Sequence, residues 1–201
     1  MTMTQNSDLT LTTLHVLKIK GRASVEEVAA STSSTPEEAA ELLSQFATDE
    51  LVVERTGGRR PGWMLSPTGR ARHEELLAEG LDDAAKEQLA QAYEGFLALN
   101  ATVKEISSRW QSVDDDAGRF ELIEDVHEIH DDAVDSLNRA GEVSPRFARY
   151  GDRLTEALEQ VETDPRFMVS PAVDSYHTVW FEAHEDFLLT LGRTREAEGS
   201  A

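Results

Sequence analysis

The sequence predicts a mainly α-helical fold in two parts: short helices followed by a β-hairpin, and then a longer run of helices. Apolar residues recur at helical spacing over most of the chain, and this spacing changes to a strand pattern only near residues 51–65. Charge divides the chain in a similar way. Residues 1–80 carry 8 Lys and Arg against 12 Asp and Glu, and the remainder carries 11 against 27, so the net charge of −20 splits into −4 and −16. We therefore expect two domains in different surroundings.

Three short helices are predicted in the N-terminal part. An apolar pattern over residues 9–19 that stops at Gly21 predicts the first helix. Ser24 and Glu27 form a capping box, in which each side chain accepts a hydrogen bond from the other residue's backbone N–H, and this box begins the second helix. A further box with proline at the first helical position begins the third helix, and its residues are Thr35, Pro36 and Glu38.

A β-hairpin and a fourth helix follow. Residues 51–55 and 63–65 have a strand pattern, and the Gly- and Arg-rich residues between them predict a turn. Ser66-Pro67 then begins a helix that ends near residue 79. This order of helices and hairpin is that of a winged helix-turn-helix domain with three to four helices and a two-stranded wing. We predict such a DNA-binding domain over residues 1–80.

The second part is predicted to be almost entirely helical. Each of its helices carries apolar residues at alternating steps of three and four, which is typical of the seam of a helix bundle. The predicted helices cover residues 82–111, 117–140, 145–162 and 170–192. We predict an acidic, four-helix bundle-like domain for sensing and dimerisation over residues 81–195, and a disordered tail over residues 196–201.

Several classes of protein are excluded by what the sequence lacks. There is no cysteine, which excludes disulfides, thiolate metal sites and a cysteine nucleophile. The N-terminal residues do not have the pattern of a secretory signal, and no run approaches the roughly 18 apolar residues of a membrane span, so we expect a cytoplasmic protein without a membrane partner. Nucleophile-elbow, phosphate-loop, His-Glu-x-x-His and dinucleotide-binding motifs are absent, so we do not expect an enzyme. No cofactor is indicated.

The N-terminal part resembles the MarR-type winged helix. The likeness is clearest in Asp49-Glu50-Leu51-Val52, in the Gly/Arg-rich turn, and in Leu65-Ser66-Pro67-Thr68-Gly69-Arg70. This resemblance implies the winged-helix fold of a regulator-like protein.

The helical part resembles a region found in actinobacterial proteins. The resembling segments are residues 96–111, 145–150 and, above all, 174–192. Those proteins are short and regulator-like with an N-terminal winged helix, and some pyruvate phosphate dikinase-like proteins carry a similar terminal region. The resemblance implies architecture alone, because the phosphate-handling domains of the dikinase are absent from this sequence.

The candidate DNA contacts are unusual because the third helix begins with glutamates. Glu37, Glu38 and Glu41 would repel phosphate, although Glu can accept a hydrogen bond from cytosine. Arginines in the turn of the hairpin suit phosphate or minor-groove contact; the alternative is a solvated hairpin. The candidate DNA-binding residues are Lys18, Lys20, Arg22, Ser33, Ser34, Thr35, Arg55, Arg59, Arg60 and Arg70.

Polar residues on the apolar seams of the second part indicate a second site. His177 and His184 flank Trp180 within an apolar stripe, and each buried polar group costs about 1–3 kcal/mol unless it is hydrogen-bonded. These groups either bond one another or, together with aromatic neighbours, line a pocket for a small-molecule effector. The candidate ligand-binding residues are Asn100, Trp110, His130, Tyr176, His177, Trp180 and His184.

A metal site is weighed and not predicted. Glu124-x-x-His127 and Asp174-x-x-His177 have the spacing of di-iron bundles, but such bundles also need a glutamate pointing inward from each of the other two helices. The leading hypothesis is a one-component transcriptional regulator, a homodimer that binds operator DNA and a small molecule. The alternative is a protein-interaction module that does not bind DNA and docks on a partner enzyme. A third hypothesis is a metal-dependent oxidase.

Overall fold

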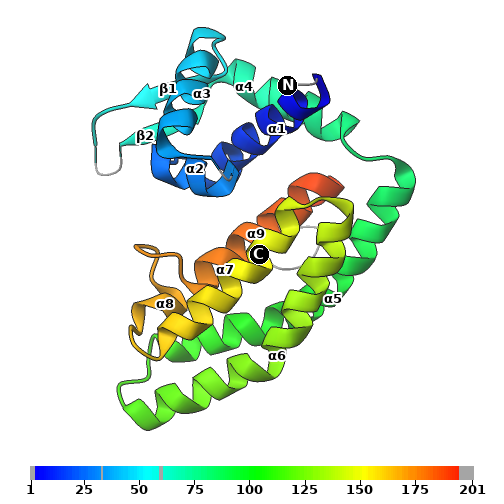
Figure 1. Cartoon of the computed structure of the whole chain (residues 1–201). Coiled ribbons are helices and arrows are strands. Elements are labelled where there is room, and N and C mark those ends of the chain that lie inside the picture. Colours follow the sequence, from blue (N-terminus) through cyan, green and yellow to red (C-terminus); the bar gives the residue numbers. More distant parts are fainter. Residues whose placement is uncertain (1–2, 33, 59–60, 195–201) are drawn as a thin grey trace. The chain divides into compact units, whose positions relative to one another are not determined.

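The computed structural model describes residues 3–32, 34–58 and 61–194, and the chain divides after Leu81 into two compact units (Figure 1). Unit 1 is residues 1–81 and unit 2 is residues 82–201. Both units are mainly helical, which confirms the predicted fold class at this level. In the sequence prediction, the division falls after residue 80.

The described residues of unit 1 form four helices and a two-stranded antiparallel sheet. Its elements are α1 (Met3–Lys20), α2 (Val25–Thr32), α3 (Pro36–Thr48), β1 (Val52–Arg55), β2 (Gly62–Leu65) and α4 (Pro67–Glu79). Val52 pairs with Leu65 and Arg55 with Gly62. Ala23, between α1 and α2, adds a one-residue bridge to the sheet: its N–H donates to the Trp63 carbonyl at 3.0 Å, and the Trp63 N–H donates back at 2.7 Å. The hairpin is therefore attached to the segment that precedes α2.

Both predicted capping boxes are confirmed. The Ser24 N–H donates to a Glu27 carboxylate oxygen at 2.8 Å, and the Glu27 N–H donates to Ser24 Oγ at 3.2 Å. Thr35 and Glu38 make the same two bonds at the start of α3. Together these helices bury one apolar cluster, which includes Leu14, Leu17, Val28, Ala39, Leu43, Phe46, Val52, Leu65 and Leu76.

The start of α4 is joined through Ser66 to the segment between α3 and β1. Its Oγ donates to the Glu50 carbonyl at 2.5 Å and accepts from the Gly69 N–H at 2.9 Å. A Cβ on Gly69 would lie 1.9 Å from the Leu51 carbonyl oxygen, so only glycine fits this approach of helix to backbone. The Ser66-to-Gly69 motif therefore has a packing role.

Between residues 82 and 194, unit 2 forms four longer helices and one short helix. They are α5 (Asp83–Trp110), α6 (Asp116–Val143), α7 (Arg146–Val161), α8 (Arg166–Val169) and α9 (Tyr176–Leu191). Each of the four longer helices packs against two of the others, in the cyclic order α5, α6, α7, α9. An aromatic core lies between them, in which Phe96 stacks on Trp180 with ring centroids 4.0 Å apart.

The predicted fourth helix of unit 2 begins too early. The apolar pattern predicts a start at residue 170, whereas α9 begins at Tyr176. Pro171 lies in the turn after α8, and the Ser175 Oγ caps α9 by accepting from the Thr178 N–H. A serine cap inside an apolar pattern therefore decides the boundary.

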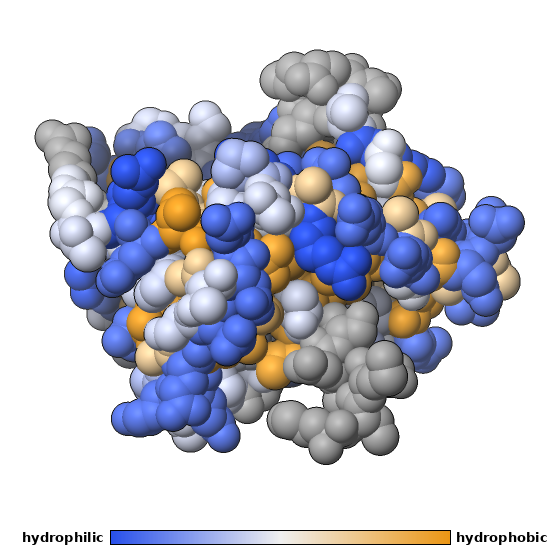
Figure 2. All heavy atoms as spheres, turned by 90° about the horizontal axis from the view of Figure 1, so that it is seen from above, coloured by the Kyte–Doolittle hydropathy of each residue, from blue (hydrophilic) through white to orange (hydrophobic). Residues whose placement is uncertain are grey.

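No helix among the described residues is long and apolar enough to span a membrane. The face drawn in Figure 2 mixes hydrophilic side chains with scattered apolar ones.

Candidate functional site

Two arginines of unit 1 flank the same end of the hairpin. Arg55 is exposed at the last position of β1, opposite Gly62, and residues 56–61 connect these two positions. The side-chain stem of Arg22 packs over Gly62, with its Cγ 3.3 Å from where a Cβ on that glycine would lie. Arg59 and Arg60, which the sequence predicts as contacts, lie outside the described residues. The structure thus places two of the candidate arginines together at this end.

The other candidate DNA-binding residues have different surroundings. Lys20 is mostly buried and its Nζ lies 3.9 Å from Glu27, Lys18 is half-buried, and Arg70 is exposed on α4. Ser34 Oγ is hydrogen-bonded to Thr32 Oγ1 at 2.8 Å, and Thr35 Oγ1 caps α3. Ser33 lies outside the described residues. Thr35 therefore caps α3, and Ser34 is bonded to the end of α2.

The solvent face of α3 is acidic. Glu37, Glu38 and Glu41 are exposed, and the helix contains no Lys or Arg. On the same helix, a shallow surface hollow is lined by Ala40, Glu41, Ser44, Gln45 and Thr48. Phosphate binding depends on neutralisation by positive side chains, so this face does not favour nucleic acid.

In unit 2, polar pairs cross the interface between α5 and α9. The Tyr93 hydroxyl lies 2.8 Å from His184 Nε2, the Trp180 indole N–H donates to Asn100 Oδ1 at 3.1 Å, and Ser107 Oγ lies 3.1 Å from His177 Nδ1. On α5, the residues of these pairs are seven positions apart, so they lie on one face of the helix. Asn100, His177, Trp180 and His184 thus lie on one interface.

The other three candidate ligand-binding residues, His130, Tyr176 and Trp110, also belong to unit 2, but they are not part of these three polar pairs. His130 is half-buried, with Nε2 3.2 Å from Thr155 Oγ1 and Nδ1 3.4 Å from the Tyr176 hydroxyl. Burial lowers the pKa of His130 and also that of His177, which favours the neutral ring. Trp110 is buried at the last residue of α5.

These distances favour mutual hydrogen bonding over an open ligand pocket. Asn100, His130, His177 and His184 all have hydrogen-bond partners within unit 2. The partner residues Tyr93, Ser107 and Thr155 are missing from the sequence-based site, although the seven-residue spacing of 93, 100 and 107 was a signal that could have found the first two.

The interface between α7 and α9 contains a second polar network, which is not among the sites predicted from the sequence. Asp186 is completely buried and accepts from Arg146 Nε at 3.1 Å, from the Tyr150 hydroxyl at 3.1 Å and from Thr190 Oγ1 at 3.0 Å. Burial, reinforced by the charge of Asp186, raises the pKa of Tyr150 well above its ordinary value. The hydroxyl therefore remains protonated and donates to the carboxylate.

Arg153 extends this network by one helical turn. Its guanidinium donates to Asp174 at 2.7 Å and to Glu182 at 2.8 Å. Burial opposes the charge, but the hydrogen bonds and charges of Asp174 and Glu182 outweigh it and raise the pKa of Arg153. Glu182, Asp186 and Thr190 are spaced by four residues along α9, and this spacing of polar residues was the available sequence signal.

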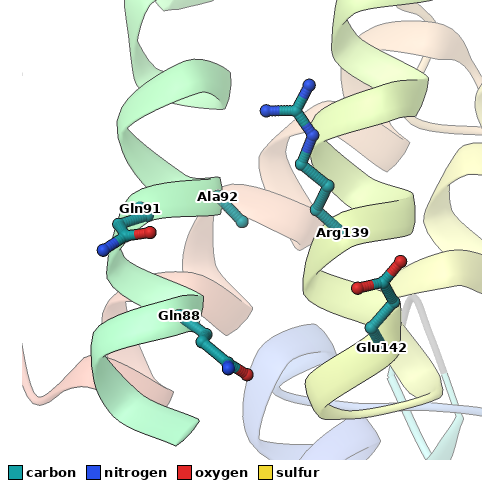
Figure 3. A pocket seen from close by; sticks show the side chains of 5 residues that line it. All are labelled: Gln88, Gln91, Ala92, Arg139 and Glu142. Carbon is teal, nitrogen blue, oxygen red and sulfur yellow. The ribbon is translucent and has the colours of Figure 1, made fainter. Parts of the chain in front are cut away.

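A hollow on the surface of unit 2 holds none of the predicted ligand residues. It lies between α5 and α6, where Gln88, Gln91 and Ala92 face Arg139 and Glu142 (Figure 3). Gln91 is hydrogen-bonded to Glu87, and Arg139 forms an ion pair with Asp135. Among the residues that the structure describes, no group of three or more His, Asp or Glu side chains is placed to hold a metal ion.

Comparisons with known proteins found no matching family model, no matching curated protein and no matching solved structure.

Proposed function

We propose that this chain is a DNA-binding transcriptional regulator in which unit 1 is a winged helix that contacts DNA mainly through its hairpin. The observation that carries this proposal is the arrangement of the strands. Ala23 bridges to Trp63, so the order is helix, bridge strand, two helices and hairpin, and Arg22 and Arg55 flank the turn end of that hairpin. This order supports the winged-helix interpretation.

The distribution of charge supports contact by the hairpin rather than by α3. Three exposed glutamates on α3 repel phosphate, whereas Arg22 and Arg55 lie at the end of the hairpin whose connecting residues include Arg59 and Arg60 in the sequence. Each arginine that neutralises a phosphate releases condensed counterions, which makes binding salt-dependent. The hairpin therefore supplies the attraction that α3 lacks.

Unit 2 suits dimerisation better than sensing. The mutual packing of α5, α6, α7 and α9 supports the predicted bundle-like domain, and a homodimer would present two hairpins to a symmetric operator. A net charge of −16 on residues 81–201 would keep this unit away from the duplex. The paired seam residues give a small-molecule effector less support. A regulator of this kind acts in the cytoplasm.

Fluorescence anisotropy on the full-length protein tests the proposal. The probe is a labelled duplex from upstream of the protein's own gene, measured at about 50 mM and about 200 mM salt. We expect Arg55→Ala with Arg22→Ala to weaken binding and to lower the salt slope by about one for each phosphate that is no longer neutralised. Arg139→Ala on α6 is the matched control and leaves binding unchanged. Absence of binding by the unaltered protein at both salt concentrations would overturn the proposal.

The acidic face of α3 favours one alternative function, a protein-interaction module. In that case Glu37 and Glu41 would contact a partner enzyme through the shallow hollow beside them. The substitution Glu37→Gln with Glu41→Gln distinguishes the two functions. It raises affinity for the duplex if unit 1 binds DNA, and it has no effect on the duplex if α3 is a protein-docking face.

A further inference from the structure

A surface hollow of unit 2 brings together polar side chains of two helices. It has a volume of about 280 Å³ and lies between the first half of α5 and the last two turns of α6. Gln88, Gln91 and Ala92 line it from α5, and Arg139 and Glu142 line it from α6 (Figure 3). These residues take no part in the hydrogen bonds of the α5–α9 and α7–α9 interfaces. The hollow is therefore a separate candidate site.

The hollow has an apolar floor because the residues where α5 and α6 approach each other are small. A Cβ on Gly95 would lie 2.8 Å from Ser136 Oγ, so the two helices are close at this level. One turn earlier on α5, Ala92 is buried and contributes only a methyl group. The longer side chains of Gln88 and Glu142 flank this methyl group from the two helices (Figure 3). A ligand would thus meet an apolar floor between polar walls.

The side chains of Gln88 and Glu142 are available to a ligand. Within the described part of the chain, neither of them forms a side-chain hydrogen bond or an ion pair. Both carry acceptor oxygens, an amide oxygen on α5 and a carboxylate on α6. A donor group that enters the hollow therefore meets acceptors from two helices.

The unpaired charge at the hollow is negative. Arg139 and Asp135 form an ion pair with each other, whereas no described side chain pairs with Glu142. Glu87 adds a second carboxylate at the α5 wall, where it accepts from Gln91 Nε2 at 3.4 Å. This charge favours a cation, but a calcium ion takes about six to eight oxygen ligands. No described group of three or more His, Asp or Glu side chains is placed to hold a metal ion, so the cation that fits is an organic one.

We propose that this hollow binds a primary alkylammonium group, with its N–H donors at the oxygens of Glu142 and Gln88 and its alkyl stem over the Ala92 methyl group. An ammonium group has three N–H donors, and a short methylene stem can cover apolar surface while its charged head stays in water. The volume of about 280 Å³ lies below the roughly 300–1,000 Å³ of sites for drug-sized ligands, so the bound group is small. A lysine side chain of a partner protein and a free aliphatic amine share this chemistry. The inference concerns unit 2 and does not depend on DNA binding.

Two-dimensional ¹H–¹⁵N NMR of the full-length protein at about 50 mM salt tests this proposal. The probes are Nα-acetyl-lysine methylamide, which carries a lysine side chain, 1,4-diaminobutane, which is a free amine, and n-pentanol, which has an uncharged stem. We expect both amines to shift the backbone amides of residues 86–93 and 137–143 with a Kd of about 1–10 mM, because exposed ion pairs are weak, and n-pentanol to shift none of them. Tighter binding of the lysine compound assigns the hollow to a partner's lysine side chain, and tighter binding of the diamine assigns it to a free amine.

A matched pair of variants separates this site from the general attraction of an acidic protein for cations. Glu142→Gln keeps the shape of the side chain and removes its charge, and we expect the Kd of both amines to rise about three- to tenfold. Glu128→Gln removes the same charge from another exposed glutamate of α6 that has no ion pair with a described residue, and it leaves the Kd unchanged. The proposal is overturned if the two variants bind the amines equally, if the shifts spread over all acidic segments of the chain, or if n-pentanol causes the same shifts.

Discussion

The two units bury polar groups in different amounts and for different structural purposes. Unit 1 buries one titratable contact, His15 with His73, inside an otherwise apolar cluster. Unit 2 buries polar pairs along the α5–α9 interface and a charged network along the α7–α9 interface. A helix packed on another through paired polar groups has one favourable register, because a shift leaves those groups without partners. The packing of helices in unit 2 is therefore specified by paired polar groups, and the packing in unit 1 mainly by helix caps and an apolar core.

Among the substitutions that test this comparison, we expect removal of Asp186 to cause the largest loss of stability. In Asp186→Ala, the half-buried Arg146 guanidinium and the buried Tyr150 hydroxyl are left without their shared acceptor, and we expect unit 2 to lose about 3–5 kcal/mol of stability. Urea denaturation followed by circular dichroism measures this loss. Asp135→Ala, in an exposed ion pair with Arg139, is the control and should cost about 1 kcal/mol or less. Equal losses in the two variants would mean that the network does not hold α9 to α7.

A matched change in unit 1 tests packing rather than polarity. In Gly69→Ala, the new Cβ would collide with the Leu51 carbonyl oxygen, so α4 must move away from β1, and we expect a loss of about 1–3 kcal/mol. Gly57→Ala provides the control because a Cβ there meets nothing within 4 Å. Thermal unfolding of both variants measures the difference, and an unaffected Gly69→Ala protein would contradict the close approach.

The polar pairs between α5 and α9 predict a smaller effect. Tyr93→Phe removes the 2.8 Å hydrogen bond to His184 and keeps the ring, so we expect a loss of about 0.5–1.5 kcal/mol. If these residues instead formed an effector site, the substitution would leave the stability of the ligand-free protein unchanged. Calorimetric unfolding of the ligand-free protein separates these two outcomes.

We expect the smallest effect in the pH dependence of the stability of unit 2. Burial lowers the pKa of His130 and of His177, so the folded unit binds fewer protons than the unfolded chain, and stability falls as the pH drops below about 6.5. Both side chains are half-buried, which limits the effect. We expect His130→Gln with His177→Gln to reduce the pH dependence of the unit 2 unfolding midpoint between about pH 7 and about pH 5. An identical pH profile in this variant would show that these rings keep their ordinary titration.

Local features of the fold could be predicted from the sequence, whereas contacts between helices could not. The capping boxes at Ser24 and Thr35 involve residues three positions apart, so their geometry depends on nothing else in the chain. The pairing of Asn100 with Trp180 depends on the register of α5 against α9, which no local pattern specifies. The sequence therefore indicates that polar residues lie on these seams without identifying their partners.

The stripe of Glu182, Asp186 and Thr190 shows why the charged network was missed. Polar residues spaced by four along a helix have the same pattern whether that face meets water or an oppositely charged neighbour. Only the matching Arg146, Tyr150 and Arg153 on α7 distinguish the two cases. Predicting such a network requires comparing the faces of two helices at once.

The pairs between α5 and α9 join residues that are 70 to 91 positions apart in the chain. During synthesis, α5 must wait for α9 to leave the ribosome before its seam has a partner, because α9 is the last described helix. Unit 1 draws its core from residues up to Leu76 and can fold while unit 2 is still being translated. In the nascent chain, α5 can pack on α6 first, but its side that faces α9 stays exposed until α9 is made, and a chaperone would protect that side.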